Sequence, residues 1–113
     1  MNQDLSNLHD LLCAQSDAIY AKMATAPDSS TMSALLTELT ELHHRIDINQ
    51  QLLFAAESQQ LTASLKGITA ANTDLTKALQ TATTAADITS SVGKFLTLVD
   101  NSLDLAKTLA TTA

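Results

Sequence analysis

The sequence predicts an all-α fold, a helical bundle of three to four helices, and composition gives the main reasons. The chain has only two Gly and one Pro among its 113 residues, which leaves too few turns for a fold of many strands. Aromatic residues make up 3% of the chain and Trp is absent, so the core must be aliphatic. A chain of this length typically forms one domain, and residues 1–113 are expected to form a single all-helical domain.

The first helix is expected over about residues 4–26. Apolar residues recur there at the three- and four-residue spacing of one helix face, and Asp4 can cap the N-terminus. Pro27 disfavours helical backbone at the residue before it, and residues 27–30 (Pro-Asp-Ser-Ser) carry the side chains of a turn. The sequence therefore predicts that this helix ends near Ala26.

A long second helix is expected over about residues 31–66, because its apolar positions follow the heptad spacing of a coiled coil. The positions of this line are Met32, Leu35, Leu39, Leu42, Ile46, Asn49, Leu53, Ala56 and Gln60. Asn49 is polar; it either fixes register and partner number between chains or faces a neighbouring helix within one bundle. Gly67 is expected to cap the C-terminus of this helix.

The remaining segment, about residues 68–112, is rich in Ala and Thr and is expected to be helical, with a break or bend near residues 87–91. The apolar stripe shifts its register there. Narrow stripes bury little surface in one chain. A long helical hairpin that completes its core by dimerisation is therefore the alternative architecture.

The predicted function is that of a non-enzymatic helical protein–protein interaction module. The expected partner is a protein, either a second copy of the chain in a homodimer or larger homo-oligomer, or another protein. An adaptor, a chaperone, an immunity protein and an assembly subunit all fit this prediction. The predicted interaction face consists of Met32, Leu35, Leu39, Leu42, Ile46, Asn49, Leu53, Val92, Phe95, Val99 and Leu103.

Charge and hydropathy exclude other partners. The formal net charge is −6, and the six Lys and Arg residues are scattered along the chain, whereas a nucleic-acid binder needs clustered cations. No apolar run is long enough to span a membrane.

The first residues lack the features of a signal peptide, and one cysteine cannot form an internal disulfide. A cytoplasmic protein is expected, with export by a route without a cleaved signal as the alternative.

Catalytic and cofactor sites are not expected. Cys13 has no flanking cation to lower its pKa and is expected to be a small core residue. His43 and Asp47 are expected to form a structural pair, and Glu41 and Arg45 an i,i+4 ion pair. No catalytic residue, cofactor or metal ligand is assigned.

The alternative function is a carboxylate and histidine metal-binding bundle. Glu41 and His44 have the Glu-x-x-His spacing of carboxylate-bridged metal sites, and Asp47 lies nearby in sequence. Such a site needs a further carboxylate from another helix.

One local pattern carries a resemblance. The sequence Lys22-Met-Ala-Thr-Ala, the turn at residues 27–30 and the leucine-rich helix after it are superficially similar to the helix-turn-helix subunits of type III secretion needles. The similarity covers only about 50 residues, and the segment after Gly67 has no counterpart in those shorter subunits. The resemblance implies an association with bacterial secretion as one form of the assembly role, and membership of that family is not inferred.

Overall fold

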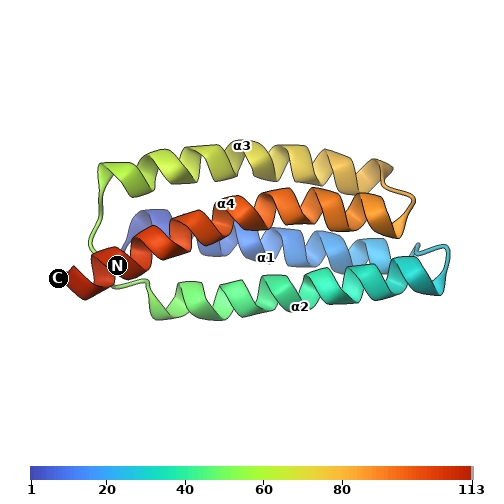
Figure 1. Cartoon of the computed structure of the whole chain (residues 1–113), viewed down its shortest axis with the longest axis horizontal. Helices are drawn as coiled ribbons and strands as arrows, with labels where there is room; N and C mark the ends of the chain where they lie inside the picture. The colour runs from blue at the N-terminus through green and yellow to red at the C-terminus, as the bar shows by residue number, and fades with distance from the viewer. Residues whose placement is uncertain (113) are drawn as a thin grey trace.

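The computed structural model describes residues 1–112, with side chains up to residue 111, as a bundle of four α-helices. The helices are α1 (Gln3–Met23), α2 (Ser29–Gln51), α3 (Gln59–Thr81) and α4 (Ala85–Thr112), and they lie side by side along one long axis (Figure 1). The predicted all-α bundle is confirmed. The alternative of one long helical hairpin is wrong, because the described chain reverses direction at three connections.

Each helix begins after a polar side chain that accepts a hydrogen bond from a backbone N–H three residues later. The acceptors are Asn2, Asp28, Ser58 and Thr84, at distances of 2.8 to 3.1 Å. These side chains satisfy N–H groups that the first helical turn leaves without partners. The prediction that Asp4 caps the first helix is wrong, since Asp4 already lies in the first turn of α1.

The predicted helix over residues 31–66 is two helices, α2 and α3, separated by residues 52–58. This connection contains neither Gly nor Pro. Its carbonyl groups are held instead by Asn2, whose backbone N–H donates to Leu53 O at 2.8 Å and whose Nδ2 donates to Ala55 O and Ala56 O at 3.2 Å. The break therefore depends on a residue that is distant in sequence.

Two further boundaries differ from prediction. Gly67 was expected to cap a helix, but it lies inside α3, and neither glycine of the described chain has a positive φ. The break expected near residues 87–91 occurs at residues 82–84. There Ala82 takes an extended conformation and the Thr84 hydroxyl accepts from the N–H of Asp87, so Asp87 belongs to the first turn of α4.

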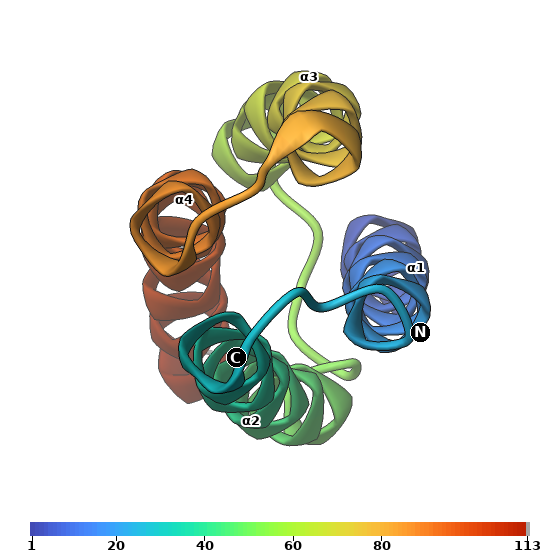
Figure 2. The same ribbon diagram turned by 90° about the vertical axis from the view of Figure 1, so that its right-hand side faces the viewer.

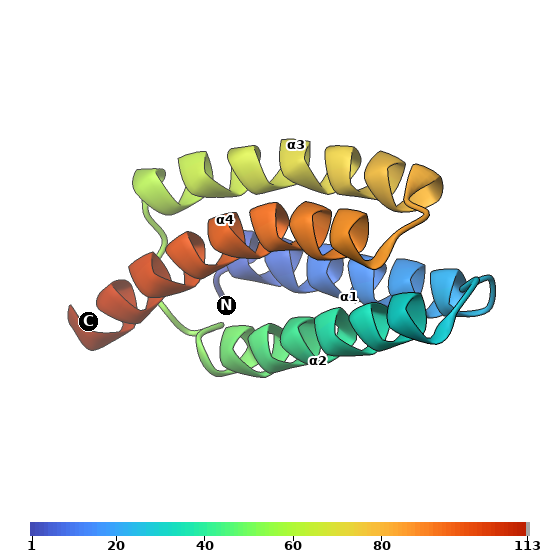
Figure 3. The same ribbon diagram turned by 45° about the vertical axis from the view of Figure 1, so that its right-hand side comes forward.

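The order of the helices around the bundle is α1, α2, α4, α3 (Figure 2). In the described chain α1 packs on α2 and α3, α4 packs on the same two helices, and the helices of the other two pairs lie diagonally opposite each other across the core. The connection from α2 to α3 crosses one end of the bundle diagonally (Figure 2). As a result α1 runs parallel to α3, and α2 runs parallel to α4 (Figure 3).

All four helices contribute aliphatic side chains to one core, whose only aromatic member among the described side chains is Phe95. The least exposed apolar side chains, at 2% or below, are Leu5, Leu8, Leu12, Ile19, Leu35, Leu42, Leu61, Ile68, Ile88, Val92, Phe95, Val99, Leu103 and Ala106. Burial of an aliphatic side chain of this size stabilises a fold by about 1.5 to 3 kcal/mol. The narrow stripes are thus covered within one chain, because each helix packs against two others.

Candidate functional site

The structure places most of the predicted interaction face inside the bundle. Leu35, Leu39, Leu42, Asn49, Val92, Phe95, Val99 and Leu103 are buried, and Met32, Ile46 and Leu53 are half-buried. The buried residues, with Ile46 and Leu53, pack within the one chain. Most of the predicted interaction face is therefore covered within the one chain, and the heptad spacing of α2 fits its packing between α1 and α4.

Asn49 illustrates this outcome. Its side chain is fully buried, and its Nδ2 donates to the carbonyl of Leu5 on α1 at 3.1 Å. Of the two roles open to Asn49 from the sequence, the structure supports contact with a neighbouring helix in one bundle. The bond also fixes the antiparallel register of α1 and α2.

The residues of the alternative metal site do not come together. Glu41 accepts a hydrogen bond from Arg45 Nη1 at 2.7 Å, which confirms the predicted i,i+4 ion pair, while His44 and Asp47 are exposed. Among the described residues no group of three His, Cys, Asp or Glu side chains is arranged to hold a metal ion. Nothing in this arrangement supports the metal-binding alternative.

Arg45 also joins α2 to α4. Its Nε and Nη2 donate to the two carboxylate oxygens of Asp100 at 2.8 and 3.0 Å. Desolvation lowers the pKa of Arg45, but the bonds to Asp100 and Glu41 outweigh it and raise the pKa. Glu38, one turn before Glu41, is buried, and its pKa is raised by desolvation and by Glu41.

Two side-chain contacts cross the outer seam between α1 and α2. The Nε2 atoms of His9 and Gln50 lie 3.2 Å apart, and the ring centroids of Tyr20 and His43 lie 6.5 Å apart. His43 therefore faces Tyr20 on α1. The predicted pair with Asp47 is not formed by the side chains that the structure describes.

Cys13 lies on the same seam and is half-buried, so the prediction of a core residue is wrong. Its Sγ is 3.8 Å from His9 Nδ1. Burial, followed by the charges of Asp17 and Asp10, raises the pKa of the Cys13 thiol. The raised pKa lowers the thiolate fraction near neutral pH, which disfavours a nucleophilic role.

Several exposed residues share the outer side of α1 and α2 with these contacts. Asp10 and Asp17 flank Cys13 at helical spacing and both act on its pKa, and Tyr20 lies one turn beyond Asp17. On α2, Asp47 lies between His43 and Gln50, and Leu36 lies two turns before His43. We name this surface the acidic face; its defining residues are Asp10, Asp17, Tyr20, Leu36 and Asp47.

The acidic face also exposes apolar side chains. Tyr20 is 53% exposed and Leu36 is 48% exposed. The Tyr20 ring lies beside that of His43 on α2, and Leu36 lies two turns before His43 on the same side of that helix. A patch that combines exposed aromatic and aliphatic side chains is typical of protein-binding surfaces.

The net charge of the chain is carried by its first half. Residues 1–58, which include α1 and α2, contain eight acidic and two basic residues, whereas residues 59–113 contain four of each. The cations of the first half do not lie on the acidic face, since Lys22 lines a pocket with α3 residues and Arg45 is bonded to Asp100. The uneven charge is readable from the sequence, but which surface carries it depends on how α1 and α2 pack.

A polar contact joins α1 to α3 within the bundle. Gln15 is 1% exposed, and its Nε2 donates to Asn72 Oδ1 at 2.7 Å and to Thr76 Oγ1 at 3.0 Å. Ser64 of α3 and Ser102 of α4 are also hydrogen-bonded. These partly buried contacts join α1 to α3 and α3 to α4.

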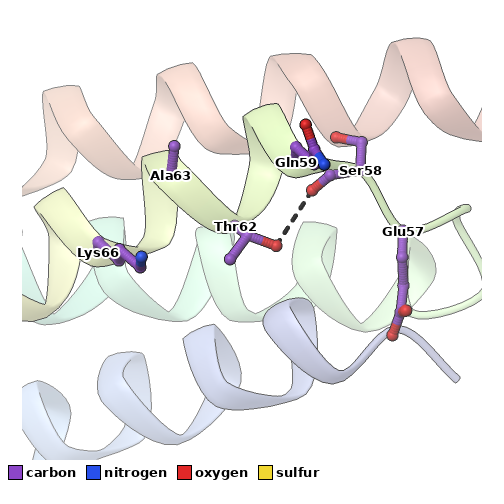
Figure 4. A pocket seen from close by; sticks show the side chains of 6 residues that line it. All are labelled: Glu57, Ser58, Gln59, Thr62, Ala63 and Lys66. Atoms are coloured by element: carbon purple, nitrogen blue, oxygen red, sulfur yellow. Dashed lines mark hydrogen bonds between the residues drawn. The ribbon is translucent and has the colours of Figure 1, made fainter.

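The pockets of the described chain are shallow. The first, of about 500 Å³, lies at the start of α3 and is lined by Glu57, Ser58, Gln59, Thr62, Ala63 and Lys66 (Figure 4). The Thr62 hydroxyl lies close to both Ser58 O, at 3.1 Å, and Asp4 Oδ2, at 2.6 Å. Most of the side chains that line this pocket are exposed, so the pocket can neither enclose a substrate nor exclude water.

Comparison of the chain with protein-family models, with curated proteins and with solved structures finds no match in any of the three. In the described chain, no helix combines the length and the apolarity that a membrane crossing requires.

Proposed function

We propose that this chain is a non-enzymatic protein-interaction module that binds a protein partner through its acidic face. Adaptor, chaperone, immunity and assembly roles, including one in bacterial secretion, are compatible with this proposal. The open, exposed lining of the pocket at the start of α3 and the raised pKa of Cys13 support a binding role over a catalytic one.

The observation that carries the proposal is the exposure of Tyr20 and Leu36 on neighbouring helices. Bundle helices normally turn such side chains toward the core, and the core of this chain is already filled from all four helices. Tyr is enriched among the residues that dominate binding energy at protein interfaces. Covering both side chains would remove apolar surface from water and stabilise a complex.

Phe54 is a further exposed apolar side chain. It lies on the connection between α2 and α3 and is 86% exposed, although the carbonyls on either side of it are held by Asn2. An exposed aromatic side chain on an anchored backbone loses little conformational freedom on binding. Phe54 is therefore a second candidate anchor for the partner.

Position-specific photo-crosslinking tests the proposal. A photoreactive residue is placed at Leu36 and, as a matched control, at Leu98 on α4, which is 38% exposed. We expect a defined protein adduct from position 36 in cells that express the chain natively, and none from position 98. Equal labelling from both positions, or none from position 36, would contradict the proposal.

The mass in solution distinguishes the two kinds of partner. In a homo-oligomer built on the acidic face, a second copy would cover Tyr20 and Leu36, since most of the heptad residues are buried within one chain. Light scattering over a hundredfold range of concentration measures the mass directly. A monomer that still crosslinks at position 36 indicates a different protein as the partner, whereas a dimer that Leu36→Ser dissociates indicates self-association.

A further inference from the structure

We infer that the partner segment bound by the acidic face is a basic amphipathic helix, an inference that rests on the proposed function. The face is built on two antiparallel helices, α1 and α2, that pack along their length. A third helix laid along such a pair places its own apolar stripe against the exposed side chains beneath it. Tyr20 and Leu36 are those side chains here.

Charge favours a basic partner. Asp10 and Asp17 lie on α1 and Asp47 lies on α2, and all three are exposed. The two cations of these helices point elsewhere: Lys22 lines a pocket against α3, and Arg45 is bonded to a carboxylate on α4. A helix with Lys or Arg on both sides of its apolar stripe would therefore meet carboxylates from both α1 and α2.

A second copy of the chain fits this face less well. In a two-fold dimer the same patch faces itself, so the carboxylates of one protomer would lie against those of the other. Opposed like charges suppress association. The charge of the face thus selects a different, basic chain over a copy of this one.

The spacing of the carboxylates predicts the pattern of the partner. Asp10 and Asp17 are seven residues apart, which corresponds to about 10.5 Å along a helix. Two basic residues seven positions apart on the partner helix would reach both carboxylates. Apolar residues that continue at three- and four-residue steps beyond the basic residue opposite Asp17 would contact Tyr20 and Leu36.

Two synthetic helical peptides of one design, added to the full chain, test the inference. Both carry a Leu stripe, and the remaining positions are Lys in one peptide and Glu in the other. We expect the Lys/Leu peptide alone to bind, measured by fluorescence anisotropy. Raising the salt concentration from about 50 to about 500 mM is expected to weaken its binding at least about fivefold, because the face is exposed to solvent.

Matched variants locate the binding. Leu36→Ser and Asp17→Asn are each expected to raise the Kd at least about fivefold. Leu98→Ser and Asp74→Asn, which change exposed residues of the α3–α4 half, should leave it within about twofold. Circular dichroism verifies that every variant is folded. No binding of the Lys/Leu peptide, or equal losses from both pairs of variants, would overturn the inference.

Crosslinking separates failure of the inference from failure of the proposed function. Asp10, Asp17 and Asp47 are all changed to Asn in the chain that carries the photoreactive residue at position 36. Loss of the native adduct supports a basic partner. An undiminished adduct would leave the protein-binding function standing and would overturn the basic helix as its ligand. An adduct that contains only a second copy of the chain would do the same.

Discussion

Arg45 of α2 and Asp100 of α4 are joined by two parallel hydrogen bonds, from Nε to Oδ1 at 2.8 Å and from Nη2 to Oδ2 at 3.0 Å. This fork fixes two parallel helices that are separated in sequence by the whole of α3. Paired, charge-assisted bonds of this geometry are stronger than ordinary hydrogen bonds, and the Arg45 side chain is only 14% exposed.

We therefore expect Asp100→Ala to lower the free energy of unfolding by about 1 to 2 kcal/mol, because Arg45 then keeps Glu41 as its carboxylate partner but loses two bonds. Urea denaturation measures the change. Asp104→Ala is the matched control on the same helix. Asp104 is exposed, and its Oδ1 lies 3.9 Å from Lys107 Nζ, so it forms only a loose surface ion pair. A loss from Asp104→Ala as large as that from Asp100→Ala would show that the fork adds nothing specific.

The buried carboxyl group of Glu38 is expected to make the free energy of unfolding depend on pH. Desolvation and Glu41 raise the pKa of Glu38 above its ordinary value, against the opposing effect of Arg45. Folding thus favours the protonated form of Glu38. The stability gained from this protonation is complete below the pKa of Glu38 in the unfolded chain, and it is lost as the pH rises through the pKa of Glu38 in the folded chain. We expect Glu38→Gln to unfold at a higher urea concentration than the wild type at about pH 7, with the two converging as the pH falls toward 4.

The control for this prediction is Glu57→Gln, at an exposed position on the connection between α2 and α3. This variant should follow the wild type at every pH. If Glu38→Gln also follows the wild type throughout, the carboxyl group of Glu38 is not held in an environment that disfavours its charge.

Leu42 and Leu36 separate core from surface on one helix. Leu42 is fully buried and Leu36 is 48% exposed. An unpaired carboxylate at position 42 has no route to water, so Leu42→Asp should unfold the chain. Leu36→Asp should change the free energy of unfolding by no more than about 0.5 kcal/mol. Far-ultraviolet circular dichroism distinguishes the two outcomes, and a folded Leu42→Asp variant would contradict the described core.

Gly67 and Gly93 lie inside α3 and α4 with helical backbone, and a Cβ added at either position would meet nothing within 4 Å. We expect Gly67→Ala and Gly93→Ala each to raise the free energy of unfolding by about 0.5 to 1 kcal/mol, because Ala loses less backbone entropy in a helix. Ala70→Gly, at an exposed position of α3, should lower it by a similar amount. Destabilisation by either Gly→Ala change would indicate a close contact at that position.

Asn49 provides a test of the bundle as a unit of one chain. Its Nδ2 bonds to Leu5 O within the chain, and its Oδ1 has no partner among the described residues. We expect Asn49→Leu to leave the mass in solution unchanged, since no second chain is needed to satisfy the side chain. A change in mass on light scattering would mean that Asn49 sets the number of chains, as a polar residue in a coiled-coil seam does.

The sequence by itself determined the fold class, the aliphatic core and the turn after the first helix. Because Gly and Pro are scarce, the chain has too few turn residues for a fold of many strands, which favours helices. Pro27 and Asp28 indicate locally where α2 begins. The i,i+4 pair of Glu41 and Arg45 was also predictable, because residues four apart on a helix are always neighbours. Each of these features depends on residues that are close in sequence.

Only the tertiary structure decided the break at residues 52–58, the diagonal crossing that follows it and the burial of the heptad face within one chain. No residue near the end of α2 in sequence causes the break. Asn2, at the N-terminus of α1, donates hydrogen bonds to the carbonyls of Leu53, Ala55 and Ala56. The acidic face required the same information, since Tyr20 and His43 meet only once α1 and α2 are packed. Helical spacing specifies which residues share a face, but which neighbour covers that face depends on contacts between segments far apart in the chain.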